Sequence, residues 1–561
     1  MPALDPARAA SFRAGGYWRG QTLDDVFRAA VSARAPGDVA VVQAEHRITW
    51  GELDRQVSAV AAGLAGLGVG TGDVVSVQLP NWPEFVVLNF AVARVGAVLN
   101  SLPATFRRRE LEYILSRARP KVYVIPRQVG DRDFLPMAEA LRESIPELEH
   151  IVVVRGDPGR AIAFDRLVQT PPADLTRLAP AGDDLGFLVF TSGTEAMPKG
   201  VLYTHDILEF SVRSVVDVLG VGTGDVIFMP SPLASTTGVL NGMDMLAMLQ
   251  TKLVLLERWD PEAAADLIER ERCAFTFIAA TFLHDLTYLD GIAERDLSSF
   301  RLFACGGSPI PVKLARDAEK VLGCRVLRAY GASEQTFVVI NRPADRSERA
   351  YLTDGLALPG REIRILDSSG QPVPAGETGE ITCRGPNVAV GYFDAPDLNA
   401  RSFDHEGFYH SSDLGVLDAD GYLTVVGRKK ELIIRGGMNI SPMEIETQLA
   451  EHPGVSEVAV VGYPDSRLGE RACAFVVPSP GSTPALPDLA EFLLAGGMAK
   501  YKLPERLEIV PALPRTPVGK VHKASLAALL GPGREDVTTS ADAPDRNRPS
   551  DHPSDEERPP A

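Results

Sequence analysis

The stretch FTSGTEAMPKG, Phe190 to Gly200, combines glycines and hydroxyl side chains with one lysine, and it follows an apolar run that begins at Leu185. Small residues let a ligand approach the backbone closely, and free N–H groups beside a lysine suit phosphate oxygens. The stretch differs from the P-loop of the common NTPases, which ends in Gly-Lys-Ser/Thr, because Lys199 lies between Pro198 and Gly200. The sequence therefore predicts a phosphate-binding loop in another fold.

Composition limits the class of protein. The chain has 561 residues, 45% of them hydrophobic, which is enough for two or more domains. Its net charge of −17 disfavours nucleic acid and anionic membranes as partners, so an anionic substrate needs a locally basic site. The N-terminus has no apolar segment, and no apolar run approaches the roughly 18 residues of a membrane span. We expect neither a signal peptide nor a membrane helix.

Cysteine usage favours a reducing compartment. The cysteines are odd in number, lie far apart and form no CxxC pair. Metal binding and disulfides stay open, but buried free thiols in a reducing cytoplasm fit this pattern better. The cysteines are Cys273, Cys305, Cys324, Cys383 and Cys473.

Strand-like apolar runs alternate with helical patterns along much of the chain. This alternation predicts an α/β fold with helices that cover a sheet. The expected strands are residues 38–43, 73–80, 121–126 and 150–154, and the expected helices are residues 49–67 and 107–118.

The later part of the chain has a different texture. Residues 355–393 are rich in glycine and proline and predict a small β subdomain. A compact α+β unit then follows, with a helix whose N-cap is Ser441 and whose capping box closes at Glu444. The tail, residues 531–561, is polar and proline-rich, and we expect it to be disordered.

The octapeptide LGVGTGDV occurs twice, at residues 67–74 and 219–226, each time between a helical stretch and a strand. One interpretation is a reused turn in which a left-handed glycine ends a helix. The other, which we favour, is a pair of similar α/β subdomains. A dinucleotide-binding fingerprint does not fit, because that motif follows a strand and opens a helix.

Six spaced motifs occur along the chain. Their residue types and order resemble the adenylate-forming superfamily, which includes acyl-CoA synthetases, adenylation domains of peptide synthetases and luciferases. The resemblance covers roughly residues 20–530. The motifs are TSGTEAMPKG (191–200), CGGSPI (305–310), YGASEQ (330–335), YHSSDLG (409–415), GRKKELIIRGGMNI (427–440) and PRTPVGKVHK (514–523).

The resemblance implies a two-step reaction that uses ATP, Mg²⁺ and CoA. A carboxylate attacks the α-phosphate of ATP to give an acyl-adenylate and pyrophosphate, and a thiol then takes the acyl group and releases AMP. The implied fold is α/β, with a large N-terminal domain of two α/β subdomains and a small β subdomain, followed by a small mobile α+β domain. We expect the AMP-binding domain at residues 1–427, the C-terminal domain with the catalytic lysine at 428–530, and the tail at 531–561.

The resemblance also implies the residues of the ATP site. Lys520 would bridge the substrate carboxylate and the α-phosphate, and Ser333 would contact that phosphate. Glu334 would hold Mg²⁺ with Thr191, because hard cations prefer oxygen ligands. Asp413 would bind the ribose hydroxyls through its two acceptor oxygens. The remaining residues implied for ATP are Ser192, Gly193, Thr194, Lys199, Gly306, Gly307, Ser308, Gly331, Arg428 and Tyr330, the last stacked on adenine.

The acyl pocket and the CoA channel follow from the same resemblance. The stretch PLASTTG, 232–238, would line the acyl pocket, and RGGMNI, 435–440, would line the channel after the small domain rotates about a hinge at Lys430. Arg471 would contact CoA, although a surface ion pair fits it equally. The residues implied are Ser235, Thr236, Gly238 and Ala329 for the acyl pocket, and Gly436, Gly437, Met438 and Arg471 for the channel.

Three residues depart from the family pattern. Glu195 adds a negative charge beside the phosphates, and Met438 replaces a glutamate that most relatives carry. Ser235 replaces a histidine, which argues against a dihydroxybenzoate pocket. Lys523, close to Lys520, reads as a structural lysine.

Three functions are compatible with these residues. We favour an acid–CoA ligase, similar to short- and medium-chain or alicyclic acid–CoA ligases such as cyclohexanecarboxylate–CoA ligases. The alternatives are an enzyme that loads an acid onto a carrier-protein phosphopantetheine and a degenerate binding protein. A basic patch for the CoA nucleotide would favour the first, and a flat apolar docking face the second. We expect a cytoplasmic monomer or homodimer.

Overall fold

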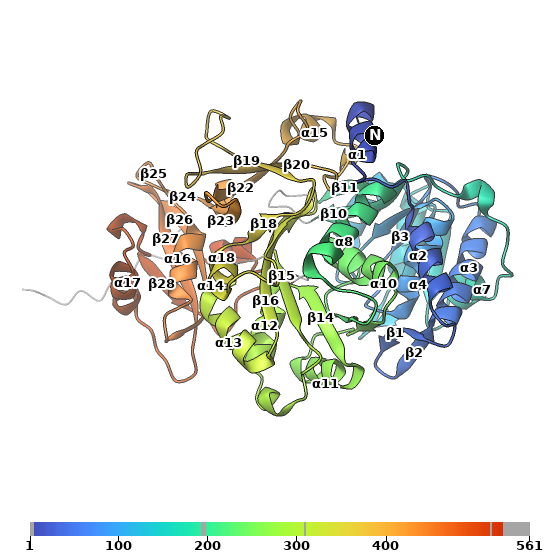
Figure 1. Ribbon diagram of the computed structural model, residues 1–561, viewed down its shortest axis with the longest axis horizontal. Coiled ribbons are helices and arrows are strands. Elements are labelled where there is room, and N and C mark those ends of the chain that lie inside the picture. Colours follow the sequence, from blue (N-terminus) through green and yellow to red (C-terminus); the bar gives the residue numbers. More distant parts are fainter. Residues whose placement is uncertain (1–4, 192–197, 308–309, 517–518, 531–561) are drawn as a thin grey trace, which may run out of the picture.

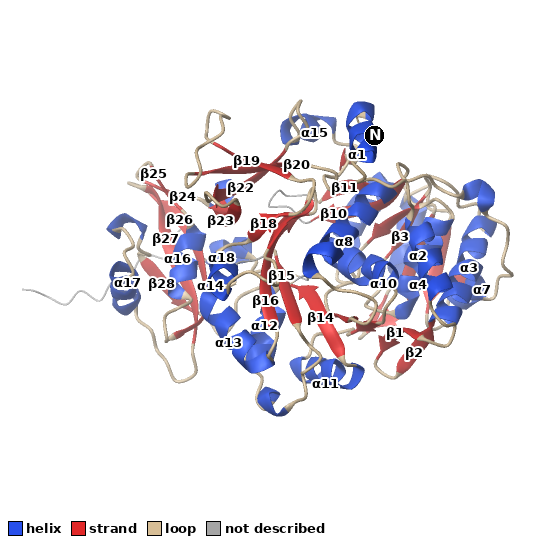
Figure 2. Cartoon of the chain, in the orientation of Figure 1, coloured by secondary structure: helices blue, strands red, loops and turns tan. Residues whose placement is uncertain are grey.

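A computed structural model describes residues 5–191, 198–307, 310–516 and 519–530. The protein is an α/β protein with a large N-terminal domain and a small C-terminal domain, as predicted (Figures 1 and 2). The large domain contains two main sheets covered by helices, and the small domain, orange to red in Figure 1, is built on a sheet of its own. No helix in the described part of the chain is long and apolar enough to cross a membrane.

The first main sheet has eight strands. Its strands from β10 to β9 pair in parallel, whereas β11 and β21 add antiparallel to one edge. Strands β5 and β8 are buried along nearly their whole length, which is typical of parallel strands covered on both faces. In sheet order the strands are β21 (Gly391–Tyr392), β11 (Lys199–Thr204), β10 (Leu185–Thr191), β4 (Val98–Ser101), β3 (Val74–Val77), β5 (Val122–Pro126), β8 (His150–Val154) and β9 (Ile162–Ala163).

The second main sheet has thirteen strands and runs without interruption from the α/β part of the large domain into its β subdomain. The junction lies where β18 pairs with β17 on one side and β23 on the other. In sheet order the strands are β19 (Glu362–Leu366), β20 (Thr378–Arg384), β22 (Tyr409–Leu417), β23 (Tyr422–Arg428), β18 (Gly355–Ala357), β17 (Thr336–Ile340), β16 (Arg325–Ala332), β15 (Leu302–Gly306), β14 (Cys273–Ile278), β12 (Val226–Met229), β13 (Leu253–Leu255), β1 (Val39–Gln43) and β2 (His46–Thr49).

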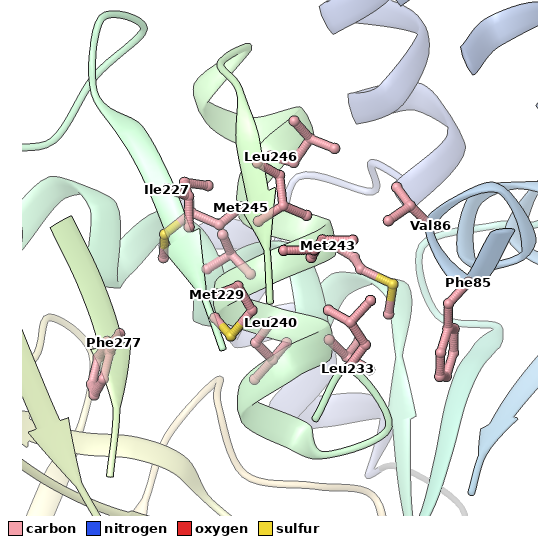
Figure 3. Packing of buried hydrophobic residues seen from close by; sticks show 14 of the residues in the cluster. Phe85, Val86, Ile227, Met229, Leu233, Leu240, Met243, Met245, Leu246 and Phe277 are labelled. Atoms are coloured by element: carbon pink, nitrogen blue, oxygen red, sulfur yellow. The ribbon is translucent and has the colours of Figure 1, made fainter. Parts of the chain in front are cut away.

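Amphipathic helices cover these sheets, and their apolar faces form the core. In Figure 3, Leu233 and Met243 pack toward Phe85 and Val86 of helix α4. The principal helices of the large domain are α1 (Pro6–Ala14), α2 (Leu23–Ala33), α3 (Trp50–Gly66), α4 (Pro83–Arg94), α5 (Arg108–Ala118), α6 (Leu135–Ser144), α8 (His205–Leu219), α9 (Thr236–Gly238), a π-helix (Val239–Asp244), α10 (Met245–Leu249), α11 (Pro261–Glu271), α12 (Ala280–Thr287), α13 (Val312–Leu322) and α15 (Pro396–Ser402).

The repeated octapeptide forms equivalent turns in the two main sheets. The first copy joins α3 to β3 and the second joins α8 to β12, so the copies lie in different sheets, as the interpretation of two similar subdomains requires. Gly68 and Gly220 adopt left-handed φ angles of +82° and +62°. In each copy an aspartate, Asp73 or Asp225, accepts a hydrogen bond from the backbone of the glycine three residues earlier.

The small domain has five strands and three helices. Its strands are β24 (Ile433–Arg435), β25 (Met438–Ile440), β26 (Val455–Asp465), β27 (Gly469–Pro478) and β28 (Arg506–Ile509), and its helices are α16 (Pro442–Leu449), α17 (Leu486–Ala495) and α18 (Lys523–Leu529). Ser441 is the N-cap residue of α16, but the predicted capping box is wrong. Its Oγ donates to the carbonyl of Val426 at 2.6 Å, and Glu444 binds Lys502 instead.

Candidate active site

The predicted phosphate loop connects two paired strands. Thr191 ends β10 and lies opposite Lys199, which begins β11. The Lys199 Nζ lies 5.7 Å from the ring centroid of Tyr392. The structure therefore pairs the two ends of the loop and places Lys199 beside Tyr392, whereas four residues named above in this loop fall outside the described part of the chain. These are Ser192, Gly193, Thr194 and Glu195, the last of which departs from the family pattern.

Glu334 lies among tyrosine hydroxyls that the sequence did not single out. Tyr392 donates to Glu334 Oε1 at 2.8 Å, and its oxygen lies 3.4 Å from that of Tyr409. Tyr203 donates to the carbonyl of Ser333. Burial, and then the negative charge of Glu334, raise the pKa of all three phenols above the ordinary tyrosine value. The three tyrosines therefore stay protonated and position the Glu334 segment as donors.

The backbone around Glu334 is tightly constrained. A Cβ at Gly331 would lie 1.8 Å from the carbonyl oxygen of Thr336, so only glycine fits there. Thr336 itself has a φ of +43°, in the left-handed region. Ala389 N donates to the Glu334 carbonyl at 2.9 Å. The turn between β16 and β17 is thus fixed from two sides, which holds the carboxylate in place.

Asp413 and Arg428 form an ion pair beside Tyr330. They lie opposite each other on β22 and β23, and Arg428 Nε is 2.8 Å from Asp413 Oδ1. Tyr330 donates to Asp413 Oδ2 at 2.8 Å and accepts from Gln335 Nε2 at 3.2 Å. Burial raises the pKa of Asp413, while the charge of Arg428 and the tyrosine hydrogen bond oppose that rise. Both carboxylate oxygens are therefore held where a diol could replace their present donors.

Lys520 extends from the small domain onto the large domain. A Cβ at Gly307 would lie 2.8 Å from Lys520 Cε and 3.1 Å from its Nζ, so the ammonium lies directly against that glycine. Desolvation and then repulsion by Arg428 lower the pKa of Lys520, whereas Asp413 and Glu334 raise it. Lys520, Asp413, Arg428 and Glu334 consequently share one electrostatic environment. Ser308, which was predicted beside them, lies outside the described residues.

The two hydroxyl side chains of the predicted acyl pocket, Ser235 and Thr236, have different hydrogen-bond partners. Ser235 is the N-cap of α9: its Oγ accepts from Gly238 N at 3.0 Å and donates to the Pro232 carbonyl at 2.7 Å. Its hydroxyl is thus already used within its own loop. Thr236 Oγ1, in contrast, lies 3.3 Å from Ser333 Oγ, which joins this loop to the Glu334 turn.

A stacked pair of aromatic rings, missed in the sequence, lies beside Gly306. The rings of Phe277 and Phe337 have centroids 4.3 Å apart and planes at 30°. A Cβ at Gly306 would lie 3.6 Å from the Phe277 ring and 3.3 Å from the carbonyl oxygen of Ala329. The predicted Gly306 and Ala329 therefore border an aromatic wall. Phenylalanines on two separate strands carry no motif, so only the pairing of the sheet could reveal this wall.

Two polar side chains that belong to no motif fix the loop predicted to line the acyl pocket. Asn81 Oδ1 accepts from Leu233 N at 2.8 Å, and its Nδ2 donates to the Ser231 carbonyl at 2.8 Å. Ser101 Oγ donates to the Ala234 carbonyl at 2.7 Å. The loop is thereby anchored to the segment just before α4 and to the end of β4.

The residues predicted for the CoA channel lie apart from this group. Gly436 and Gly437 form the turn between β24 and β25, with φ angles of +58° and +83°. Met438 is 42% exposed. Arg471 Nε lies 2.6 Å from Asp465 Oδ2, so it forms the ion pair that was the alternative. In this arrangement of the domains Gly436, Gly437 and Met438 are exposed, and Arg471 is half-buried in its ion pair.

The structure also describes two further lysines named from the sequence, and the hinge role of Lys430 stays a prediction. Lys430 is exposed in a short 3₁₀ turn, Lys429–Glu431, directly after β23, where a hinge was expected. The Lys523 Nζ lies 2.8 Å from Glu446 and 3.2 Å from Glu431, which makes it a structural lysine.

The combined geometry suits an anionic ligand that carries a diol. Lys520 and Arg428 share the electrostatic field of the Asp413 and Glu334 carboxylates, and the backbone of Gly307 lies against Lys520. Within the described ranges, no group of three or more His, Cys, Asp or Glu side chains could hold a metal ion. Glu334 alone would serve a cation such as Mg²⁺, which takes its other ligands from water and phosphate.

Comparison with known proteins identifies the family. The sequence model described as AMP-binding enzyme matches residues 27–393, and that of the AMP-binding enzyme C-terminal domain matches residues 444–520. The chain belongs to the AMP-binding enzyme family. This AMP-binding enzyme is an adenylate-forming acid–thiol ligase that uses ATP.

Relatives of this AMP-binding enzyme differ in the acceptor that their names indicate. The chain is 36% identical over 521 residues to a medium-chain fatty-acid–CoA ligase of Escherichia coli (strain K12), with 92% of each chain covered. It is 32% identical over 523 residues to a 2,3-dihydroxybenzoate-AMP ligase of Bacillus subtilis (strain 168), covering 92% of this chain and 95% of the relative.

Solved structures of related ligases show the same fold. The anthranilate–CoA ligase AuaEII in complex with anthranoyl-AMP matches with a TM-score of 0.84 at 26% identity, over 91% of this chain and 98% of that one. ATP-bound MatB from Rhodopseudomonas palustris matches with a TM-score of 0.82 at 29% identity, over 91% and 99%.

Proposed function

We propose that the protein is an ATP-dependent carboxylic acid–CoA ligase, which forms acyl-CoA, AMP and pyrophosphate through an acyl-adenylate. The position of Lys520 carries the proposal. The small domain brings this lysine against Gly307 and into the field of Asp413 and Glu334. A cation there neutralises charge where a carboxylate must approach an anionic phosphate.

In the adenylation step the side chains act by binding and positioning. Asp413 accepts hydrogen bonds from the ribose hydroxyls. Arg428 leaves its ion pair with Asp413 and turns toward a phosphate. Lys520 lies between the acid and the α-phosphate. Lys199 and Thr191, at the base of the loop, hold the pyrophosphate end.

Glu334 would hold Mg²⁺. One carboxylate, fixed by Tyr392 and with the hydroxyls of Ser333 and Thr236 nearby, fits a small hard cation that takes its remaining ligands from phosphate and water. When bound, the ion supplies neutralising charge at the phosphates.

We propose an acid with a compact apolar body, such as a short- or medium-chain or alicyclic acid. The stacked rings of Phe277 and Phe337 border Gly306 and Ala329, so the acyl group would meet hydrocarbon and aromatic surface. Ser235 uses its hydroxyl as a helix cap and offers no polar group to a substituted benzoate. The fatty-acid specificity in the name of the Escherichia coli relative agrees with this choice.

An arginine cluster on an otherwise acidic protein favours CoA as the acceptor. Arg107, Arg108 and Arg109 are exposed, and burial followed by repulsion from Arg107 lowers the pKa of Arg132. The cluster follows β4, whose last residue, Ser101, bonds the acyl-pocket loop. Gathered guanidinium groups suit the phosphates of the CoA nucleotide.

A specific observation supports a carrier-protein acceptor as the second candidate. Ile434 and Met438 are 54% and 42% exposed on the two strands of the β24–β25 hairpin. Ile434 pairs with Asn439 and Met438 pairs with Arg435, so the two apolar side chains lie on opposite faces of the hairpin, and each is exposed to a docking protein. The aryl-AMP ligase of Bacillus subtilis among the relatives agrees with this alternative.

Acid-dependent pyrophosphate release, measured across a panel of carboxylic acids with and without CoA, tests both candidates. We expect release with an apolar acid, followed by acyl-CoA when CoA is added. Release without acyl-CoA would overturn the CoA assignment in favour of a carrier protein. No release with any acid, while Lys520→Ala behaves like the wild type, would favour the degenerate binding protein. A cytoplasmic location and a monomer or homodimer stay predictions.

A further inference from the structure

Within the described residues, helix α13 has no side-chain cap from its own chain segment. Its N-cap residue is Pro311, which has no side-chain acceptor, although the first N–H groups of a helix need partners. The small domain supplies one: Glu451 Oε1 accepts from Lys313 N at 3.0 Å. Glu451 follows α16, so the cap crosses from one domain to the other.

The capped helix belongs to the wall of the active site. It begins just after the segment that carries Gly307, against which Lys520 lies. A second contact joins the same region, because a Cβ at Gly519 would lie 2.7 Å from Thr281 Oγ1 on α12. Helices α12 and α13 pack on each other. The small domain therefore touches this helix pair at two points, with Lys520 placed at the Gly307 segment nearby.

The Lys313 side chain is a hydrogen-bond donor only, so it cannot serve as an acceptor for its own N–H. Its Nζ binds Asp317 at 2.8 Å and donates to the Tyr288 hydroxyl at 3.1 Å, and neither contact involves the small domain. When the small domain rotates away, the Lys313 N–H loses its hydrogen bond to Glu451 and donates to water instead. The helix dipole adds to the free-energy difference between the arrangement with Glu451 at α13 and the arrangement without it, because a carboxylate is favourable at a helix N-terminus.

We propose that Glu451 is a positioning residue for adenylation: it caps α13 across the domain junction and so favours the domain arrangement that places Lys520 at Gly307. This inference rests on the proposed two-step function. Removal of an N-cap acceptor changes an equilibrium by about tenfold. Loss of the Glu451 carboxylate should therefore shift the balance between domain arrangements by about that factor, away from adenylation.

Half-reactions of the full-length enzyme test the proposal. We expect Glu451→Ala to raise the apparent KM for ATP in acid-dependent pyrophosphate exchange by up to about tenfold. Thioester formation from supplied acyl-adenylate should be unchanged or faster. Glu451→Gln keeps an acceptor oxygen and should recover most of the exchange activity. The matched control is Glu444→Ala, because Glu444 lies on α16 but binds Lys502 of its own domain.

A distance measurement tests the same proposal without chemistry. The five native cysteines are buried, so spin labels at Ala293→Cys in the large domain and Thr483→Cys in the small domain would react selectively. Glu451→Ala should move the distance distribution away from that of the parent, and Glu451→Gln should restore it. An unchanged distribution, or an equal change in Glu444→Ala, would overturn the proposal.

The two readouts separate failure of this inference from failure of the proposed function. A parent enzyme that makes acyl-adenylate but no acyl-CoA would overturn the CoA assignment, yet its pyrophosphate exchange would still test Glu451. A parent enzyme with no exchange would overturn the proposed reaction, and the label distances would still decide whether Glu451 controls the domain arrangement. Equal losses by Glu451→Ala in both half-reactions would contradict a role in positioning.

Discussion

Lys520 brings a charge from the small domain to the Gly307 segment of the large domain. Lys520→Ala should therefore lower acid-dependent pyrophosphate release by at least about 100-fold, the scale of losing one group that stabilises transition-state charge. Thioester formation from supplied acyl-adenylate should be nearly unaffected. Lys500→Ala, which removes an exposed lysine of the same domain, is the control. Equal loss of both half-reactions by Lys520→Ala would refute this role.

The lowered pKa of Lys520 predicts an alkaline limit on adenylation. Desolvation and Arg428 favour the neutral amine, so the ammonium loses its proton below the ordinary lysine pKa of 10.5. Only the protonated form neutralises charge, so adenylation should fall as the pH rises through that lowered pKa. The profile of pyrophosphate exchange from pH 7 to 10.5 checks this. In Lys520→Arg, whatever activity remains should show no such fall, because arginine stays charged.

Tyr392 donates one hydrogen bond to Glu334, the carboxylate that we propose binds Mg²⁺. Tyr392→Phe removes the hydroxyl that donates to Glu334 Oε1 and leaves the ring in place. Partners of a metal-binding residue typically contribute about 10-fold or more in metal affinity. We expect the Mg²⁺ concentration for half-maximal adenylation to rise by about that factor, with little change in the KM for CoA. An unchanged Mg²⁺ dependence would show that Glu334 is positioned without Tyr392.

The charged residues of the site could be predicted from sequence, whereas its uncharged frame could not. The motif resemblance named Lys520, Asp413 and Glu334, and the structure places them in one electrostatic environment, while their individual roles stay predictions. Asn81 and Phe277 lie far from any motif and act only because strand pairing and helix packing bring them to the pocket. A side chain that supports a loop from a distant element leaves no local pattern.

At the scale of elements, the predicted strands and helices agree with the structure, because their apolar periods match the faces that they bury. The expected strand at residues 73–80 is β3 (Val74–Val77), and the expected helix at 107–118 is α5 (Arg108–Ala118). The capping box at Ser441 failed for a tertiary reason. The Ser441 hydroxyl binds Val426 across the domain junction, a partner that local sequence cannot reveal.

The first turn of α8 contains a buried histidine that should make the large domain sensitive to acid. Burial lowers the pKa of His205 from 6.5 to about 4, so the folded state keeps it neutral while the unfolded state takes up a proton. Above pH 6.5 this histidine is neutral in both the folded and the unfolded state, so its protonation does not lower the free energy of unfolding. The free energy of unfolding then decreases as the pH falls toward 4, by about 3 kcal/mol in total.

Urea unfolding at pH 7 and pH 5 measures this decrease. The chain's four tryptophans all precede residue 260, so their fluorescence reports the large domain. His205→Gln should reduce the loss of stability between the two pH values, whereas His46→Gln, at an exposed position, should leave it unchanged. An identical pH dependence in His205→Gln and the parent would exclude His205 as a cause.

At the scale of the molecule, charge is distributed unevenly. The net charge is −17, yet exposed arginines gather at Arg107, Arg108 and Arg109. If this cluster binds the CoA nucleotide, salt should screen the attraction. Raising NaCl from about 50 to about 300 mM should increase the KM for CoA several-fold. The KM for pantetheine, which lacks the nucleotide, should change little, and the Arg107→Ala/Arg109→Ala variant should lose the salt effect. A salt effect that is the same for both thiols would place CoA elsewhere.

The continuous thirteen-stranded sheet determines which parts of the molecule can separate from each other. Tyr330 on β16 and Asp413 on β22 belong to one hydrogen-bonded sheet, so the residues proposed for adenine and for ribose cannot separate without breaking backbone pairing. Proteolytic nicking at the exposed turn Lys429–Glu431 cuts no strand of that sheet. A nicked molecule should thus still bind AMP, while the small domain that carries Lys520 is no longer covalently tethered to the large domain. Such a particle would recognise the nucleotide without being able to activate an acid.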